Sequence, residues 1–301
     1  MSTFHSLAGV YAAAVTPLQP DFSPSLDGTL RLLDFLAQRG CHGALLFGTT
    51  GEGPSFAQAE RHAVLQAARS VRQAHPAFRL LAGTGTPSLE ETVELTRAAF
   101  DLGCDGVVTL PPYYFRKVSD DGLFAWYSQV LRRAVPQGGA FFGYHIPAVS
   151  GVGLSFDLLA RLRDAFPDRF AGIKDSTGDP EHARLLGERF GRDLVVLTGH
   201  DRLLTHALSH HASGCITAMA NVTAPLLRQV YDAFTRRAPD APTQARLEAY
   251  RAVMDRYPPA PALYKGLLSA DHGFPAWSVR PPLLPLPPET LQAARDELAL
   301  I

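Results

Sequence analysis

Short runs of apolar residues recur along the chain and are separated by longer segments with helical periodicity, up to about residue 235. Each run is too short for a helix, and none alternates cleanly between apolar and polar positions. Such runs are typical of parallel strands that are buried on both faces. The predicted strands are Val10–Val15, Ala44–Phe47, Arg79–Ala82, Gly106–Leu110, Ala140–Tyr144, Phe170–Ile173, Leu194–Thr198 and Gly214–Thr217.

The segments between these runs predict helices, because their apolar residues recur at intervals of three and four. Ser88, with Glu91 three residues later, is typical of a capping box. A stripe of apolar residues follows Ser119, and Ser155 is placed to cap another helix. The remaining predicted helices are one opened by Asp27 and closed by Gly40, an eighth helix at about 224–236, and three near 241–256, 259–270 and 288–299.

Eight strand-and-helix repeats favour a closed barrel over an open doubly wound sheet. We therefore predict a (β/α)8 TIM barrel over residues 1–236. Residues 237–301 are expected to form a C-terminal helical layer packed on the barrel, so that the whole chain is a single domain. The length of 301 residues is within the range that such barrels reach.

Composition excludes several classes of protein. Lys and Arg number 28 and Asp and Glu 29, a net charge of −1, so no charge excess attracts nucleic acid or an anionic membrane. The amino terminus lacks the pattern of a signal peptide, and no run approaches the roughly 20 apolar residues that cross a bilayer. Cys41, Cys104 and Cys215 are widely spaced, which fits buried thiols in a reducing cytoplasm better than disulfides or a zinc site.

Lys174 is the most informative position for chemistry. In a barrel of this kind the active site lies at the carboxyl ends of the strands, and Lys174 directly follows the predicted strand Phe170–Ile173. Burial among apolar walls is expected to lower the pKa of its amine and to supply the neutral nucleophile that Schiff-base chemistry needs. The alternative is a structural lysine paired with Asp175 or Asp179.

Two glycine- and threonine-rich turns follow predicted strands. The turn Gly48-Thr49-Thr50-Gly51 offers consecutive backbone N–H groups and two hydroxyls, which suits a substrate carboxylate but is also common in ordinary loops. The shorter turn Gly83-Thr84-Gly85-Thr86 lacks a full dinucleotide or phosphate-loop pattern and is interpreted as a close-packed turn.

Tyrosines and histidines supply weaker candidates. Tyr144 and Tyr114 are suited to relaying protons, although a buried tyrosine is more often a packing residue. His206 and His210 are four residues apart, as zinc ligands on a helix are. However, they lack the glutamate of the H-E-x-x-H motif and a third ligand, so a surface or packing role is favoured and no metal is predicted. His200 falls on the expected active rim.

Together these motifs resemble the dihydrodipicolinate synthase/N-acetylneuraminate lyase family of pyruvate-dependent class I aldolases. The resemblance runs in order over most of the chain and is specific for the family, though not for one member. Its segments are Ala14-Val15-Thr16-Pro17, Gly48-Thr49-Thr50-Gly51-Glu52, Ala82-Gly83-Thr84-Gly85, Pro112-Tyr113-Tyr114, Tyr144-His145-Ile146-Pro147, Gly172-Ile173-Lys174-Asp175 and Ala220-Asn221.

The resemblance implies that Lys174 condenses with the keto carbon of pyruvate or of another 2-keto acid, without any cofactor. It also implies that family members are homo-oligomers, commonly tetramers. The implied site residues are Tyr144 as the proton shuttle; Thr49 and Tyr114 as a hydroxyl relay, with Tyr114 offered across a subunit interface; Thr50 and Gly51 on the substrate carboxylate; and Ile216 beside the bound pyruvate.

The particular substrate is harder to predict. The synthases usually carry an arginine where this chain has Val149, and valine cannot make a bidentate pair with a second carboxylate. The run at 146–152 instead resembles the sialic acid lyase branch, in which Ser176, Gly199 and Asp201 become candidates for binding substrate hydroxyls. Arg202 and Ala218 depart from that branch, which favours a 2-keto-3-deoxy sugar acid over N-acetylneuraminate.

Three functions therefore remain open. The first is an aldolase or lyase that cleaves a 2-keto-3-deoxy acid to pyruvate and an aldehyde. The second is a dihydrodipicolinate (4-hydroxy-tetrahydrodipicolinate) synthase, or a related dehydratase, which uses the same lysine imine. The third is a protein that binds a keto acid without catalysis, and it has no need for the nucleophile and the proton relay together.

Overall fold

The computed structural model describes residues 3–301. Its eight strands close into a barrel in chain order, and the strand pairs are parallel. The predicted (β/α)8 fold is therefore confirmed. The strands are β1 (Gly9–Ala13), β2 (Gly43–Leu46), β3 (Arg79–Gly83), β4 (Gly106–Thr109), β5 (Ala140–His145), β6 (Phe170–Asp175), β7 (Val195–Thr198) and β8 (Gly214–Thr217).

The predicted strands match the observed ones within one or two residues. The differences that matter for chemistry are at the ends of β5 and β6, which continue to His145 and Asp175. Lys174 consequently lies inside a strand and not in the loop after it, and Tyr144 is no longer the last residue of its strand. Position within a strand holds a side chain more firmly than a loop does, because the backbone on both sides is hydrogen-bonded to its neighbours.

The chain falls into two compact units by its internal contacts. One consists of the residues up to Gly9 together with Arg79–Ile216, and the other of Val10–Phe78 together with Thr217–Ile301. The boundary predicted at residue 236 coincides with none of the three junctions, at 9/10, 78/79 and 216/217, and the C-terminal helical layer over 237–301 stays a prediction.

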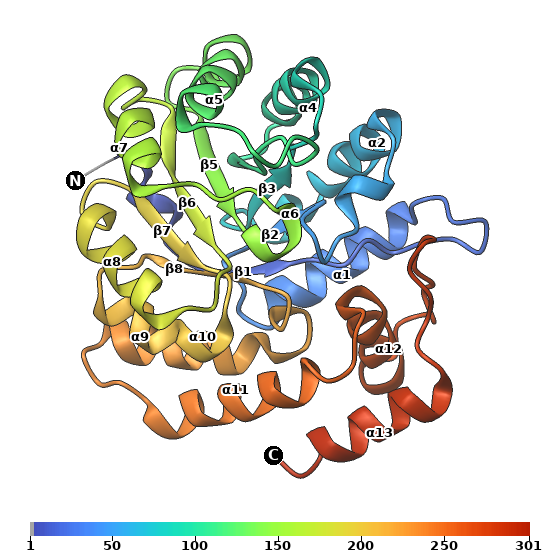
Figure 1. Ribbon diagram of the computed structural model, residues 1–301. Helices are drawn as coiled ribbons and strands as arrows, with labels where there is room; N and C mark the ends of the chain where they lie inside the picture. Colours follow the sequence, from blue (N-terminus) through green and yellow to red (C-terminus); the bar gives the residue numbers. More distant parts are fainter. Residues whose placement is uncertain (1–2) are drawn as a thin grey trace. The chain divides into compact units, whose positions relative to one another are not determined.

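The first unit contains most of the barrel strands, from β3 to β8, and the helices that follow them. Figure 1 shows α4, α5, α7 and α8 arranged outside these strands. Its helical segments are η1 (Thr3–Leu7), α4 (Leu89–Asp101), α5 (Asp120–Ala134), α6 (Pro147–Ser150), α7 (Phe156–Ala165), α8 (Pro180–Phe190), η3 (Asp201–Leu203) and α9 (Leu204–Ser209).

The second unit contains β1, β2 and the C-terminal helices, among which α11 packs against α10 and α13 (Figure 1). None of the helices described between residues 3 and 301 is both long and apolar enough to cross a bilayer. The helical segments of this unit are α1 (Leu26–Gln38), η2 (Gly53–Ser55), α2 (Gln58–Ala68), α3 (Val71–Ala74), α10 (Ala220–Thr235), α11 (Ala241–Met254), α12 (Ala260–His272) and α13 (Pro288–Leu298).

Helix capping follows the sequence in most places. The hydroxyls of Ser88, Ser119 and Ser155 each accept a hydrogen bond from a backbone N–H in the first turn of their helix. The prediction that Asp27 opens the first helix is wrong. Ser25 is the cap, since its hydroxyl accepts from the N–H of Gly28, and Asp27 lies in the first turn, where its negative charge favours the helix dipole.

Candidate active site

Lys174 and Tyr144 are neighbours in the first unit. They are paired across β5 and β6, and both side chains are buried. The amine nitrogen of Lys174 lies 4.1 Å from the centre of the Tyr144 ring. Within residues 3–301, no group forms a hydrogen bond or an ion pair with that amine, so the predicted alternative of a structural pair with Asp175 or Asp179 is wrong. Asp175 instead contacts Thr177 and His182, and Asp179 caps α8.

The approach of β6 to β7 explains one feature of the sequence around Lys174. A Cβ atom added at Gly172 would lie 2.0 Å from the carbonyl oxygen of Val195. Only glycine allows the two strands to come this close. The Gly172-Ile173-Lys174 order therefore has a packing reason as well as a chemical one.

The predicted hydroxyl-binding residues lie where β6 and β7 end. A Cβ atom at Gly199 would lie 2.0 Å from the hydroxyl oxygen of Ser176, so these two residues are brought together. Asp201 follows in η3 and is fully buried. Ile216 is also fully buried, in β8, one residue beyond the Thr198–Cys215 pair of the β7–β8 ladder.

His200 and Arg202 lie over the turn that follows β6. The ring of His200 packs against Gly178, whose φ of +70° is a left-handed conformation that favours glycine. The Arg202 guanidinium donates a hydrogen bond of 3.3 Å to the Gly178 carbonyl. The side chains of His200 and Arg202 thus lie over the turn that follows β6, near the carboxyl ends of β6 and β7.

A group of three residues next to Lys174 and Tyr144 was missed by the sequence analysis. His145 is paired with Asp175 across β5 and β6, and the ring of His182 from α8 stacks on that of His145 at 4.9 Å. The Nε2 atom of His182 lies 3.6 Å from a carboxylate oxygen of Asp175. His145 and His182 are far apart in the sequence, with no motif linking them, so no local pattern could have predicted the stack.

Burial controls the charges of this histidine–aspartate group. Desolvation, with a smaller effect from His182, lowers the pKa of His145 to about 4. Desolvation also raises the pKa of Asp175, against the opposing effects of His182 and Thr177. At neutral pH His145 is therefore an uncharged ring.

The same three residues are the only histidine, cysteine or acidic group between residues 3 and 301 that is close enough to hold a metal ion. The hydrogen bonds argue against that role. Leu154 donates its N–H to Nδ1 of His145 at 2.8 Å, so the proton of the neutral ring is on Nε2. A nitrogen that carries a proton has no lone pair for a metal, and the group fits a set of positioning contacts better than a ligand set.

His206 and His210 make contacts with neighbouring residues of the fold. His206 contacts the carbonyl of Pro180 at 2.9 Å, and His210 lies 3.3 Å from a carboxylate oxygen of Glu188. Neither belongs to the candidate metal group among the described residues.

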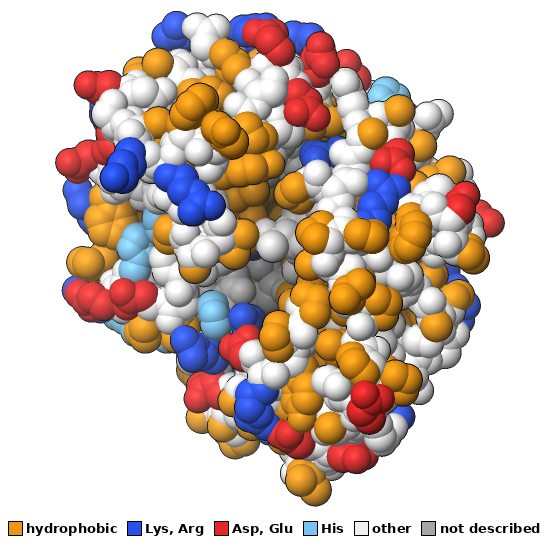
Figure 2. Space-filling model, turned by 45° about the vertical axis from the view of Figure 1, so that its right-hand side comes forward, with side chains coloured by type: hydrophobic (Ala, Val, Ile, Leu, Met, Phe, Trp, Pro, Cys, Tyr) orange, Lys and Arg blue, Asp and Glu red, His pale blue; other side chains and the backbone are white. Residues whose placement is uncertain are grey.

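Tyr114 lies on the loop between β4 and α5, away from the buried residues. Its side chain is 75% exposed and packs edge-on against Phe115, which is 72% exposed. Two large aromatic rings exposed side by side are unusual unless a partner covers them. Figure 2 shows that hydrophobic side chains on the face drawn gather in groups and are not evenly scattered.

The turn Thr49-Thr50-Gly51 lies in the second unit, directly after β2. Thr50 is buried, whereas Thr49 is exposed. A Cβ at Gly51 would lie 2.8 Å from the carbonyl oxygen of Ala14, and the hydroxyl of Thr16 donates to the Gly51 carbonyl. The glycine is therefore required by the close approach of the chain after β1.

The residue after this turn is Glu52, which adopts a left-handed conformation with φ of 55°. A residue other than glycine holds this conformation only when its surroundings enforce it. Lys265 donates to one Glu52 carboxylate oxygen at 2.6 Å, and the backbone N–H of Arg280 donates to the other at 2.8 Å. The side chains of Glu52 and Lys265 are almost completely buried.

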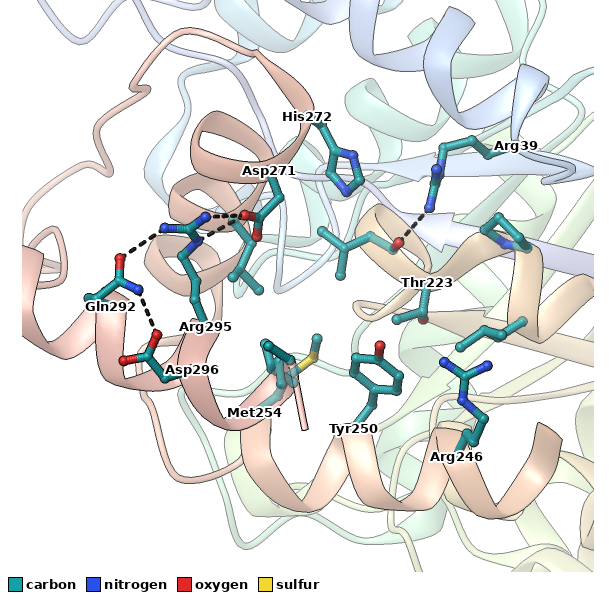
Figure 3. Close-up of a pocket in the computed structure, with 16 residues that line it drawn as sticks. Arg39, Thr223, Arg246, Tyr250, Met254, Asp271, His272, Gln292, Arg295 and Asp296 are labelled. Carbon is teal, nitrogen blue, oxygen red and sulfur yellow. Dashed lines mark hydrogen bonds and ion pairs between the residues drawn. The ribbon is translucent and has the colours of Figure 1, made fainter. Parts of the chain in front are cut away.

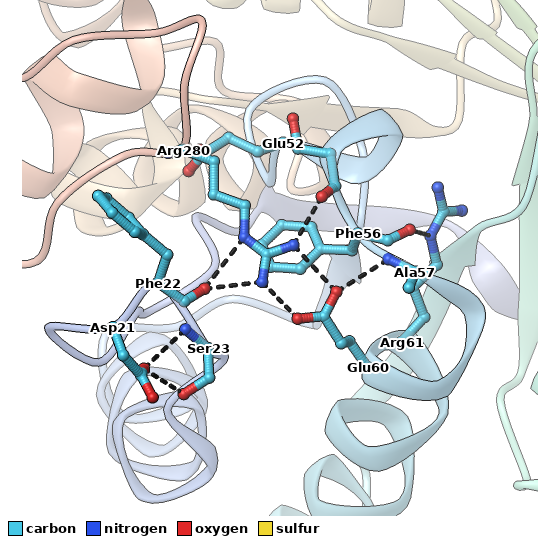
Figure 4. A network of polar contacts seen from close by, with 10 residues as sticks. Asp21, Phe22, Ser23, Glu52, Phe56, Ala57, Glu60, Arg61 and Arg280 are labelled. Atoms are coloured by element: carbon cyan, nitrogen blue, oxygen red, sulfur yellow. Dashed lines mark hydrogen bonds and ion pairs between the residues drawn. The ribbon is translucent and has the colours of Figure 1, made fainter.

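Arg280 extends this bracing around the turn (Figure 4). Its guanidinium donates to the carbonyls of Phe22 and Ser55 and to the carboxylate of Glu60, and it lies over the ring of Phe56 at 4.2 Å. The backbone of the segment at 278–280 and the side chains of Lys265 and Arg280 thus hold the turn in place. The sequence analysis did not find these partners.

Asn221 performs a similar task at the end of β1. Its side chain is fully buried, donates to the Ala13 carbonyl at 2.8 Å and accepts from the N–H of Val15 at 3.2 Å. These hydrogen bonds of Asn221 give a structural reason for the Ala220-Asn221 segment of the predicted resemblance.

An eight-stranded parallel barrel with a buried lysine in β6 places the protein among the TIM-barrel enzymes. The model of the dihydrodipicolinate synthetase family matches residues 6–300, and the chain belongs to this family, whose members are class I lyases.

Individual relatives agree. An uncharacterized DapA-like lyase of Chloroflexus aurantiacus is 38% identical over 292 residues, which cover 95% of this chain and 94% of the relative. The crystal structure of dihydrodipicolinate synthase from Agrobacterium tumefaciens has a TM-score of 0.87 at 31% identity, with 97% and 98% of the two chains covered. YagE, a prophage protein of the same family from E. coli solved in complex with pyruvate, has a TM-score of 0.89 at 25% identity, with 97% and 98% covered.

Proposed function

We propose that this lyase forms a Schiff base between Lys174 and a keto acid, and that it cleaves a 2-keto-3-deoxy sugar acid reversibly to pyruvate and an aldehyde. The observation that carries the proposal is the environment of Lys174: a buried amine beside the Tyr144 ring, with no ion pair or hydrogen bond among residues 3–301. An amine held in this way is available to add to a carbonyl group. The pyruvate bound in the YagE structure supports the same class of ligand.

The proposed reaction uses this chain's own groups. The Lys174 amine adds to the keto carbon, and water leaves to give an iminium. The iminium accepts the electron pair of the C3–C4 bond as the proton of the C4 hydroxyl is removed, which releases the aldehyde and leaves an enamine. Protonation of the enamine and addition of water return pyruvate and the free amine. Tyr144 is the proposed proton carrier because it is the neighbour of Lys174 across the strands.

Other residues of the proposal have narrower roles. Thr49, Thr50 and Gly51 are proposed to bind the substrate carboxylate, with Tyr114 and Thr49 as the hydroxyl relay. Ser176, Gly199 and Asp201 are proposed to bind the substrate hydroxyls, and Ile216 to line the site. The contact between Ser176 and Gly199 supports a common role for these two positions.

A synthase or dehydratase is the second candidate, and one contact favours it. Val149 is 59% exposed at the position where the synthases usually have an arginine. However, the side chain of Arg116 lies across Gly151, where an added Cβ would be 2.8 Å from its Cδ. Arg116 therefore offers a guanidinium close to the segment that the missing arginine would occupy. The test compares turnover of pyruvate plus aspartate semialdehyde with turnover of a panel of 2-keto-3-deoxy sugar acids. Faster turnover of the first pair, lost in Arg116→Ala, would favour the synthase.

Borohydride reduction in the presence of pyruvate tests the imine directly. The chain has three lysines, Lys117, Lys174 and Lys265, so peptide mass mapping has only three outcomes to separate. We expect the reduced adduct on Lys174, none in Lys174→Met, and an unchanged yield in Lys117→Arg, which replaces an exposed lysine.

An adduct on another lysine would overturn the assignment of Lys174. Pyruvate binding without any adduct would favour the non-catalytic keto-acid protein. A homotetramer is proposed from the family resemblance and a cytoplasmic location from the spacing of the cysteines and the pattern of the amino terminus. Light scattering on the purified protein tests the first.

A further inference from the structure

A cavity of about 570 Å³ lies in the second unit, within the size range of small-molecule sites. None of the residues proposed for catalysis lines it. Its walls come from the end of α1 and from α10, α11, α12 and α13. The apolar part of the lining consists of Val222, Pro225, Leu226, Met254, Leu267, Leu298 and Ala299.

Two guanidinium groups give this apolar cavity a positive charge. Arg39 and Arg246 both line it, and neither has an acidic partner among residues 3–301. Figure 3 shows both of them beside Thr223. The third arginine of the lining, Arg295, is neutralised by Asp271. Asp296, which accepts a hydrogen bond from Gln292, also lines the cavity. The three arginines and two aspartates of the lining therefore leave a net charge of +1, and Arg39 and Arg246 are the arginines without an acidic partner among the described residues.

Arg39 has a structural contact that uses only part of its hydrogen-bonding capacity. It donates to the carbonyl of Val222 at 2.8 Å, where α10 departs from helical geometry at Thr223 and contains Pro225. Its Nε atom is buried without a hydrogen-bond partner. Burial also lowers the pKa of Arg39, which shows that its charge is partly desolvated and gains from an anion nearby.

Arg246 has no structural contact of this kind. Its side chain is exposed on α11, and no hydrogen bond or ion pair within residues 3–301 holds it. An ordinary surface arginine fits that description, but this one borders the cavity together with a partly desolvated second arginine.

Two further polar groups border the cavity without hydrogen bonds among the described residues: the hydroxyl of Tyr250 and the ring of His272 (Figure 3). Burial, with a further effect from Arg39, lowers the pKa of His272, so its ring is uncharged at neutral pH. The cavity thus combines two arginines without an acidic partner among the described residues, two neutral polar groups and an apolar wall, beside the Arg295–Asp271 pair and Asp296.

We propose that this cavity binds a small organic carboxylate with an apolar body, held at its charged end by Arg39 and Arg246. Guanidinium groups recognise carboxylates through paired hydrogen bonds, and the apolar wall accounts for the rest of the ligand. The proposal concerns a second ligand site and does not depend on the imine chemistry of Lys174.

Titration calorimetry with 4-phenylbutyrate tests this proposal, with saturating pyruvate present to occupy a keto-acid site. We expect saturable binding that weakens about 10-fold in Arg39→Gln and in Arg246→Gln, as expected for the loss of a hydrogen bond to a charged group. Arg236→Gln is the matched control, because Arg236 is an exposed arginine of the same unit and is absent from the cavity lining. We expect it to bind as the wild type does.

The neutral analogue 4-phenylbutan-1-ol separates charge recognition from simple apolar binding, and it should bind much more weakly. Three results would overturn the proposal: no saturable binding of the carboxylate, equal affinity for the alcohol, or an affinity unchanged in Arg246→Gln. Arg246→Gln is the decisive variant, since it disturbs no contact within the fold, whereas Arg39→Gln also removes the bond to Val222.

Discussion

The two buried lysines of this protein have opposite environments. Lys265, in the second unit, donates to Glu52 at 2.6 Å and to the carbonyl of Ser278 at 2.7 Å. Lys174, in the first unit, is similarly buried, but its amine lies beside the Tyr144 ring and forms no hydrogen bond or ion pair within residues 3–301. A buried ammonium is costly unless it is paired, so the fold satisfies one lysine and leaves the other available for chemistry.

This difference separates the two lysines more clearly than burial does, since both are buried, and it supports the proposed reactive role of Lys174. Lys265 is committed to a hydrogen-bonded pair that braces Glu52 and the turn before it. Lys174 contributes no pairing that the fold would lose. Removing each lysine should therefore damage different properties of the protein, and the four predictions that follow are ordered by the size of the expected effect.

Lys174→Met should abolish activity without unfolding the protein. We expect kcat to fall by at least about 10⁴-fold, because the covalent step has no substitute nucleophile. The free energy of unfolding should stay the same or rise, since the variant removes a buried amine and leaves no hydrogen-bond or ion-pair partner of that amine unsatisfied among the described residues. Steady-state kinetics and urea denaturation check the two halves, and a strongly destabilised variant would break the comparison.

Lys265→Met should have the reverse effect on stability. It leaves the Glu52 carboxylate buried without its counter-ion, which is expected to cost about 3–5 kcal/mol of unfolding free energy. The double variant Lys265→Met with Glu52→Gln should recover part of this loss, because the stranded charge is also removed. A loss in Lys265→Met no greater than that in Lys174→Met would show that the Glu52 pair does not matter.

Acid should weaken the region around Lys174 through His145. The pKa of His145 is lowered from 6.5 to about 4 in the folded protein, so the unfolded chain takes up the proton first as the pH falls. Stability that is present above pH 6.5 is then lost progressively towards pH 4, by at most about 3 kcal/mol. Asp175 opposes this trend, because its raised pKa makes the folded protein take up a proton earlier than the unfolded chain.

His145→Asn isolates that contribution, because an asparagine oxygen can still accept the N–H of Leu154. Urea denaturation at intervals between pH 4 and pH 7 should give a flatter pH dependence in the variant than in the wild type. Parallel curves for the two proteins would assign the acid sensitivity to other groups.

Arg280→Lys should produce the smallest change. The substitution keeps the charge but loses the forked contacts with Glu60 and Phe22, and we expect about 1 kcal/mol of unfolding free energy because both charged groups are partly exposed. The backbone N–H of residue 280 still reaches Glu52, so the turn should stay braced. Thermal denaturation compares the stability of this variant with that of Lys265→Met. An equal loss of stability in the two variants would contradict the expected larger effect of Lys265→Met.

Local sequence was sufficient for the elements and for the strand that carries Lys174. The strand of Lys174 could be predicted because a short apolar run, bounded by polar residues, has few other structures open to it in a barrel. Ser88, Ser119 and Ser155 could be predicted as caps because capping is a contact over three residues. Asp27 was wrongly predicted because Ser25 offers an equally good cap two residues earlier, and the choice depends on where the chain turns.

The contacts that the sequence could not predict are those between distant residues. Lys265 and Glu52 are 213 positions apart, and His182 of α8 meets His145 of β5 only in the folded chain. Neither pair has a spacing or a motif from which the contact could be predicted. The cavity bordered by Arg39 and Arg246 is of the same kind, since it arises from the packing of five helices.

The sequence by itself thus determined the barrel, the order of its elements, the family and the place of Lys174 in the sixth strand, because each rests on periodicity or on a short ordered motif. The tertiary structure alone decided which buried lysine is paired, which histidine stays uncharged and where an arginine-lined cavity opens. Those properties depend on desolvation and on hydrogen-bond partners, and both are set by residues that meet only when the chain has folded.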